Sequence, residues 1–131
     1  MLTGPPQSTR FMTSEAELHE AIKSLSILSE HSELYEEFAS LGCASSLVGL
    51  LTHENTDIAG DVVEVISELT DEDVDAEAEQ WSALVDAMID ADLLDMLISN
   101  LQRLDESNES ERSVVYFTLS IFTQLQGSFA L

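Results

Sequence analysis

Apolar residues recur every three or four positions along most of the chain, which is the spacing of one face of an α-helix. The pattern begins near Leu18 and continues to Leu125 with short polar interruptions. The run "SVVYFTL" has the composition of a strand, but it lies inside a longer helical pattern that follows a capping signal. The pattern therefore predicts an all-α fold of about seven helices with short connections.

Capping residues mark where several of these helices begin and end. Ser14 followed by Glu17 predicts the start of the first helix, because the two side chains can form a capping box. Asn108 and Glu111 repeat this pattern before the last helix. Gly42 is placed to end the second helix in a left-handed conformation, which glycine adopts at little cost.

The helix expected from Asn55 or Thr56 to about Thr70 has faces of different character. One face is apolar and is predicted to lie in the core: Ile58, Val62, Val65, Ile66 and Leu69. A second face, called the acidic stripe below, carries four carboxylates: Asp57, Asp61, Glu64 and Glu68. A third side has the small residues Ala59, Gly60 and Ser67. We expect a neighbouring helix to pack on the small side and the acidic stripe to face solvent.

Two blocks of sequence share an order of short helix, polar turn and longer helix, which indicates an internal repeat. The blocks close on Leu69 and Leu125, which lie further apart than the about 40–47 residues of a helical repeat. An acidic insert accounts for the excess. The predicted organisation is a flexible leader (1–12), N-terminal capping helices (13–41), a first repeat (42–71), the acidic insert (72–80), a second repeat (81–126) and the truncated end of a helical stack (127–131).

Charge narrows the functions that such a stack can have. The chain has 131 residues, a formal net charge of −22 and only four Lys and Arg residues. A surface this acidic is repelled by phosphate, which argues against direct binding of nucleic acid or of anionic membranes. A cationic partner is favoured instead. The chain also lacks a signal peptide and any run near the ~20 apolar residues of a membrane span, so a soluble intracellular protein is expected.

No residue pattern singles out an enzyme or a cofactor. Cys43 is the only cysteine, which excludes an internal disulfide and a thiolate cluster. The histidines His19, His31 and His53 lack the spacing of a zinc site, and we expect them on the surface or at helix caps. The chain is therefore predicted to be non-enzymatic and to need no cofactor.

The acidic insert is the remaining candidate for chemistry. Its side chains partly match a calcium-binding EF-hand loop, but Ala76 and Ser82 stand where that loop needs Gly and Glu. We expect instead a flexible loop that offers a secondary acidic surface to a basic partner, through Asp71, Glu72, Asp73 and Asp75.

Two stretches together resemble a known family. The run "GCASSLVGLLTHENTDIAGDVVEVISELTDED" is similar to an armadillo repeat, in which a glycine precedes a short helix and an amphipathic third helix closes on a leucine. With "LVDAMIDADLLDMLISNLQRLDES", it resembles the N-terminal armadillo region of the beta-catenin-like protein 1 family (catenin-beta-like, Arm-motif containing nuclear proteins), over about residues 11–124. The resemblance implies a right-handed armadillo/HEAT-like helical solenoid.

The resemblance also implies a function. The family consists of non-enzymatic nuclear scaffolds that are associated with the spliceosome and pre-mRNA splicing and that bind basic, localisation-type segments of partners. Basic segments of splicing-complex proteins are therefore the expected partners, and the nucleus the expected location. Family members are several times longer than this chain. The alternative is a structural capping or self-association module, with partner binding carried by repeats absent from this chain.

Import-receptor armadillo repeats hold a peptide with an Asn near the end of the third helix and a Trp one turn earlier. The matching positions here hold Glu68 and Gln124 in place of Asn, and Glu64 and Ser120 in place of Trp. Without these Asn and Trp residues, which form the Asn–Trp ladder of import receptors, the acidic stripe would have to capture a basic segment by charge alone. The simpler interpretation, which the sequence favours, is the solvated face of a very acidic protein, and both interpretations stay open at this point.

Overall fold

The chain folds into helices joined by short turns and 3₁₀ segments. A computed structural model describes residues 7–71 and 73–129, and within these ranges there is no strand. The α-helices are α1 (Gln7–Ser24), α2 (Tyr35–Ser40), α3 (Cys43–Gly49), α4 (Thr56–Leu69), α5 (Ala78–Asp90), α6 (Leu93–Leu101) and α7 (Glu109–Phe129). The 3₁₀ segments are η1 (Leu25–Glu30), η2 (Ser32–Leu34) and η3 (Leu50–Thr52). The all-α prediction is confirmed, and none of the described helices has the length and apolar character needed to cross a membrane.

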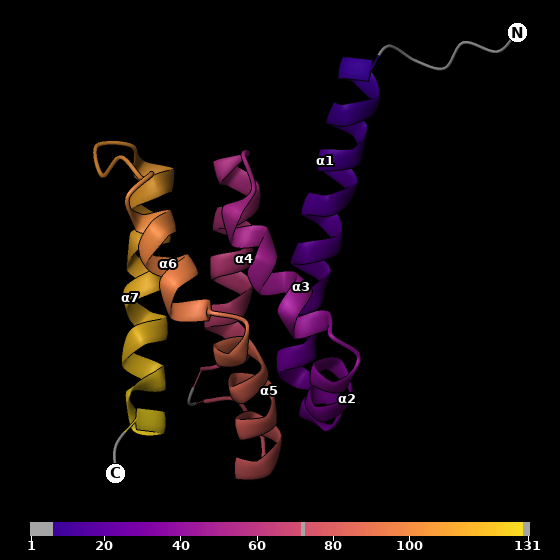
Figure 1. The fold of residues 1–131 in the computed structure, drawn as a ribbon, viewed down its shortest axis with the longest axis vertical. Coiled ribbons are helices and arrows are strands. Elements are labelled where there is room, and N and C mark those ends of the chain that lie inside the picture. The colour runs from indigo at the N-terminus through magenta and orange to yellow at the C-terminus, as the bar shows by residue number, and fades with distance from the viewer. Residues whose placement is uncertain (1–6, 72, 130–131) are drawn as a thin grey trace, which may run out of the picture.

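The long helices α1, α4 and α7 lie side by side, with α4 in the middle (Figure 1). Gly60 of α4 approaches Val114 of α7, and Thr70 at the end of α4 hydrogen-bonds to Gln124 near the end of α7. The two helices therefore run in the same direction. The shorter helices pack largely on one another, since α5 contacts α2, α3 and α6. The result is one layer of parallel long helices, supported by shorter ones.

Helix α4 forms the centre of the core. Its predicted apolar stripe is confirmed, since none of these five side chains is more than 2% exposed. Its small side is packed as expected: Ala59 is fully buried, and a Cβ atom on Gly60 would lie only 2.9 Å from Cγ2 of Val114. Glycine at position 60 therefore lets α7 approach α4 closely.

Two aromatic side chains satisfy carbonyl groups at the C-terminal end of α4, which have no partner within the helix. The hydroxyl of Tyr35 donates to the carbonyl of Leu69 at 2.8 Å, and Nε1 of Trp81 donates to the carbonyl of Thr70 at 3.2 Å. Burial raises the pKa of the Tyr35 hydroxyl to about 12, so it stays a donor at neutral pH. These bonds tie α2 and α5 to the same end of α4.

Most predicted caps are confirmed. The side chain of Asn55 accepts a hydrogen bond from the backbone N–H of Asp57 at 2.9 Å, and that of Asn108 accepts from Ser110 at 2.9 Å. Gly42 follows α2 with a φ of 81°, in the expected left-handed conformation. The turn between α5 and α6 uses a left-handed Asp92 with a φ of 68°, a conformation that was not predicted from the sequence.

Two predicted boundaries are wrong. Helix α1 begins at Gln7, so residues 7–12 are helical, and Ser14 lies inside the helix instead of capping it. No Gly or Pro between Gln7 and Ser14 interrupts the helix. Helix α5 begins at Ala78, so residues 78–80 of the predicted insert are also helical, because Glu77 and Gln80 form a reciprocal capping box. Residues 1–6 of the predicted leader lie outside the described residues.

Candidate functional site

A cavity of about 530 Å³ lies between α1, α4 and α7, near the N-terminal ends of α4 and α7. Among the described side chains, the carboxylates that define the acidic cavity are Asp57, Asp61 and Glu64 from α4 and Glu111 from α7. Apolar groups of Ile58, Val114 and Phe117 also line it. The fold therefore brings three residues of the acidic stripe together with a fourth acid from the neighbouring long helix.

Asp57 and Glu111 both lie near the start of their helices, as the second residue of α4 and the third residue of α7. Each lies in the first turn, where the positive end of the helix dipole favours a carboxylate. The side chain of Asn55 accepts from the backbone N–H of Asp57, and the side chain of Asn108 accepts from the backbone N–H of Glu111 at 3.3 Å. Among the described residues, neither carboxylate takes part in an ion pair. Both can therefore meet an added cation.

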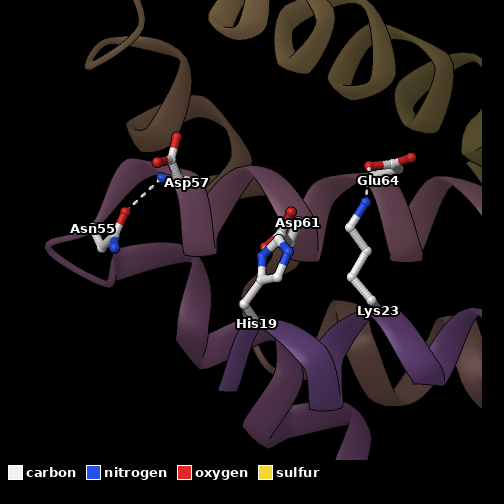
Figure 2. A network of polar contacts seen from close by, with 6 residues as sticks. All are labelled: His19, Lys23, Asn55, Asp57, Asp61 and Glu64. Atoms are coloured by element: carbon white, nitrogen blue, oxygen red, sulfur yellow. Dashed lines mark hydrogen bonds and ion pairs between the residues drawn. The ribbon is translucent and has the colours of Figure 1, made fainter. Parts of the chain in front are cut away.

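Helix α1 supplies nitrogen-bearing side chains that contact the other two carboxylates of the cavity. Nδ1 of His19 contacts Oδ2 of Asp61, and Nζ of Lys23 lies 3.6 Å from Oε2 of Glu64 (Figure 2). The Asp61 side chain is only 12% exposed and that of Glu64 is 36% exposed. The expectation that the whole stripe faces solvent is therefore wrong, because α1 covers part of it. His19 is 46% exposed, so it lies at the surface as expected, and its ring also contacts Asp61.

Glu68 lies outside the cavity, further along the contact between α1 and α4. Burial raises the pKa of its carboxyl, and the negative charge of Glu64 raises it further. The charge of Lys23 and a hydrogen bond from Ser26 act in the opposite direction but do not compensate. Three acids of the stripe therefore line the cavity, whereas Glu68 lies outside it and its charge is not fully balanced by nearby positive charge.

The secondary acidic loop lies at the other end of α4, so the structure does not join it to the acidic cavity. Oδ1 of Asp71 accepts from the backbone N–H of Asp73 at 2.8 Å, and the carbonyl of Asp75 accepts from the hydroxyl of Ser32 at 2.8 Å. Glu72 lies outside the described residues. Within the described part of the chain, no group of three or more His, Cys, Asp or Glu residues is placed to hold a metal ion.

The positions that match the import-receptor ladder make internal bonds on α7. Oε1 of Gln124 accepts from the Thr70 hydroxyl at 2.7 Å, and the Ser120 hydroxyl donates to the carbonyl of Tyr116 at 3.1 Å. On α4, Lys23 already pairs with Glu64. A peptide held at this surface would therefore depend on charge and on the cavity, and not on an Asn–Trp ladder.

The contribution of α7 to the site was not predicted from the sequence. Glu111, Val114 and Phe117 complete the cavity on the side opposite α1. A usable signal was present, since Asn108 places Glu111 in the first turn of α7 as Asn55 places Asp57 in that of α4. Placing the first turns of the two capped helices side by side would have brought these two acids close together.

Comparison with known proteins identifies a family. The sequence model described as "Catenin-beta-like, Arm-motif containing nuclear" matches residues 5–129. The chain is 44% identical over 116 residues to the Beta-catenin-like protein 1 homolog of Schizosaccharomyces pombe and 38% identical over 118 residues to Beta-catenin-like protein 1 of Homo sapiens. These alignments cover 88% and 89% of this chain but 20% and 21% of the relatives. The chain therefore spans about a fifth of the length of the relatives it matches.

Proposed function

Because this chain belongs to the catenin-beta-like, Arm-motif containing nuclear family, we propose that it is a non-enzymatic protein–protein interaction scaffold of the nucleus. It is associated with the spliceosome and pre-mRNA splicing, and it needs no cofactor. Its acidic cavity binds basic, localisation-type segments of partner proteins. Nucleic acid and membranes are not bound directly, because the net charge of −22 repels phosphate.

The acidic cavity is the observation that carries this proposal. A Lys or Arg side chain has an apolar stem and a charged head. The cavity offers matching surfaces, since Val114 and Phe117 can contact the stem while Asp57 and Glu111 meet the head. Its volume of about 530 Å³ lies within the range of roughly 300–1,000 Å³ that is common for ligand sites.

The charge of the whole chain adds long-range attraction to this local fit. A net charge of −22 draws a cationic segment towards the surface before any contact forms. Added salt screens such attraction over about 10 Å at 0.1 M ionic strength. Binding at the acidic cavity should therefore be strong at low salt and weaken steadily as salt is added.

The test is a titration of a fluorescently labelled peptide rich in Lys and Arg, followed by anisotropy across a salt series. The site variant is Asp57→Asn/Glu111→Gln, which removes two charges from the cavity with little change in shape. The matched control is Glu36→Gln/Glu37→Gln, because these acids also lie in the first turn of a helix, α2, and do not line the cavity. Both variants change the net charge equally.

We expect the cavity variant to bind the peptide about ten-fold more weakly, and the control to change affinity by less than about two-fold, as expected when cavity contacts add to general attraction. Equal weakening in both variants would show that binding follows net charge alone and would reject the cavity as the site. Circular dichroism checks that both variants remain folded.

A second candidate function is structural capping or self-association. It is favoured by apolar side chains exposed on the outer helices: Tyr116 is 68% exposed and Leu119 is 55% exposed on α7, and Ile98 is 48% exposed on α6. Tyr116 and Leu119 are one turn apart, so they form a continuous apolar strip on α7. The oligomeric state in solution separates the two candidates.

A further inference from the structure

Helix α1 places a lysine and a histidine on the surface that the proposed function assigns to a basic partner. His19 and Lys23 are one turn apart on α1, and they meet Asp61 and Glu64, which are one turn apart on α4 (Figure 2). Lys23 is one of only four Lys and Arg residues in the chain. One of these few cations therefore forms an ion pair with a carboxylate of the acidic cavity.

We propose that α1 is a built-in competitor for the acidic cavity: Lys23 occupies Glu64, His19 occupies Asp61, and a basic partner segment binds by taking the place of these two side chains. This inference rests on the proposed function and adds its regulation. The contact also shows which chemistry the surface accepts, since an ammonium group and an imidazole already bind it.

The backbone of α1 is anchored in the core, whereas its competing side chains are partly exposed. Ile22, between His19 and Lys23 in sequence, is 1% exposed and anchors α1 in the core. The side chains of His19 and Lys23 are 46% and 51% exposed. A lysine has a flexible stem, so its ammonium group can leave Glu64 without any movement of the helix. A partner therefore has to displace only side-chain tips, and α1 stays packed.

This arrangement selects partners by the number of their cations. A partner's single lysine that replaces Lys23 at Glu64 exchanges one ammonium for another and gains little. A segment with several cations can also reach Asp57 and Glu111, which have no internal cation among the described residues. Clustered Lys and Arg side chains should therefore bind, and isolated ones should not compete effectively.

The experiment compares peptide affinity in Lys23→Gln and Arg112→Gln, with the same labelled Lys/Arg-rich peptide used as the probe. Each variant removes one positive charge, so general attraction to the peptide rises equally in both. Arg112 is exposed on α7 and does not line the acidic cavity, which makes it a matched control. Lys23→Arg is added because it keeps the competing charge.

We expect Lys23→Gln to bind the peptide about two- to five-fold more tightly than Arg112→Gln, which is the effect of losing one exposed competing ion pair. Lys23→Arg should keep the affinity of the unmodified chain. In a Glu64→Gln background, the effect of Lys23→Gln should disappear, because the competition acts through that carboxylate.

The outcomes separate this inference from the proposed function. If the unmodified chain binds the peptide but Lys23→Gln and Arg112→Gln are equal, α1 is not a competitor and the cavity proposal stands. If only Lys23→Gln binds measurably, both proposals are supported. If no variant binds the peptide, both are overturned. Lys23 is half exposed, so these substitutions leave the core intact, and circular dichroism verifies it.

Discussion

Glu68 is the residue of the acidic stripe whose environment opposes its charge. Burial and the neighbouring Glu64 raise its pKa above the ordinary value of 4.5. A carboxyl with a raised pKa in the folded state is most favourable when protonated, and its contribution to stability is lost as the pH rises through that raised value. At neutral pH, ionised Glu68 therefore opposes folding.

We expect Glu68→Gln to raise the free energy of unfolding at pH 7 by a few tenths of a kcal/mol, which is the size of a like-charge pair on a helix. The gain should shrink as the pH falls towards 4.5, because the native carboxyl then becomes neutral as well. Urea unfolding at several pH values measures both effects. A gain that is constant with pH would show that charge is not its cause.

At the same scale, the sequence predicted which residues carry charge but not how they are paired. The four-three-four spacing placed the acids of the stripe on one face of α4, because helical spacing is a local property. The contacts of Asp61 with His19 and of Glu64 with Lys23 join residues about forty positions apart. Such pairs depend on how two helices dock, and no local pattern specifies them. The stripe therefore remains a predicted binding surface, but with two of its acids shared with α1.

Among the helices, the contact between α4 and α7 is the one most sensitive to side-chain size. A Cβ atom on Gly60 would lie 2.9 Å from Cγ2 of Val114, and a branched valine cannot turn aside easily. Gly49 in α3 has no neighbouring atom within 4 Å of its Cβ position and adopts a helical φ of −59°. The same substitution at the two glycines should therefore have opposite effects.

We expect Gly60→Ala to lower the free energy of unfolding by about 1–2 kcal/mol, since overpacking costs about 1–3 kcal/mol and the better helix propensity of alanine returns up to about 1 kcal/mol. Gly49→Ala should raise stability by a few tenths of a kcal/mol. Chemical denaturation measures both. In the double variant Gly60→Ala/Val114→Ala, the cost should be smaller than the sum of the single costs; simple additivity would contradict a steric origin.

At the level of elements, the sequence was most informative where a cap and an apolar stripe agreed. For α4, Asn55 and the buried stripe predicted both the start and the inner face correctly. For α1 and α5, the expected starts were wrong, because residues 7–12 lack a helix breaker and because the box of Glu77 and Gln80 was overlooked. Family membership and the helical layers confirm the armadillo-type solenoid, while its division into two repeats stays a prediction.

At the scale of the whole molecule, electrostatic repulsion opposes association between copies of the chain, whereas exposed apolar side chains favour it. The net charge of −22 makes copies of the chain repel one another and attracts basic segments. The exposed Tyr116 and Leu119 on α7 favour contact with another apolar surface. Salt weakens the electrostatic force and leaves the apolar one intact or stronger. The salt dependence of an interaction therefore indicates which of the two surfaces it uses.

This difference separates the two candidate functions. If the apolar strip of α7 mediates self-association, sedimentation velocity should show monomers at low salt and a growing share of dimers as salt is added, because screening removes the repulsion. Tyr116→Ser/Leu119→Ser should abolish the dimers at every salt concentration, whereas Asp57→Asn/Glu111→Gln should leave the apolar contact in place. Binding of a basic peptide should follow the opposite course and weaken with salt. A chain that stays monomeric at high salt while it binds the peptide at low salt would exclude self-association and leave the acidic cavity as the functional surface of this part of the protein.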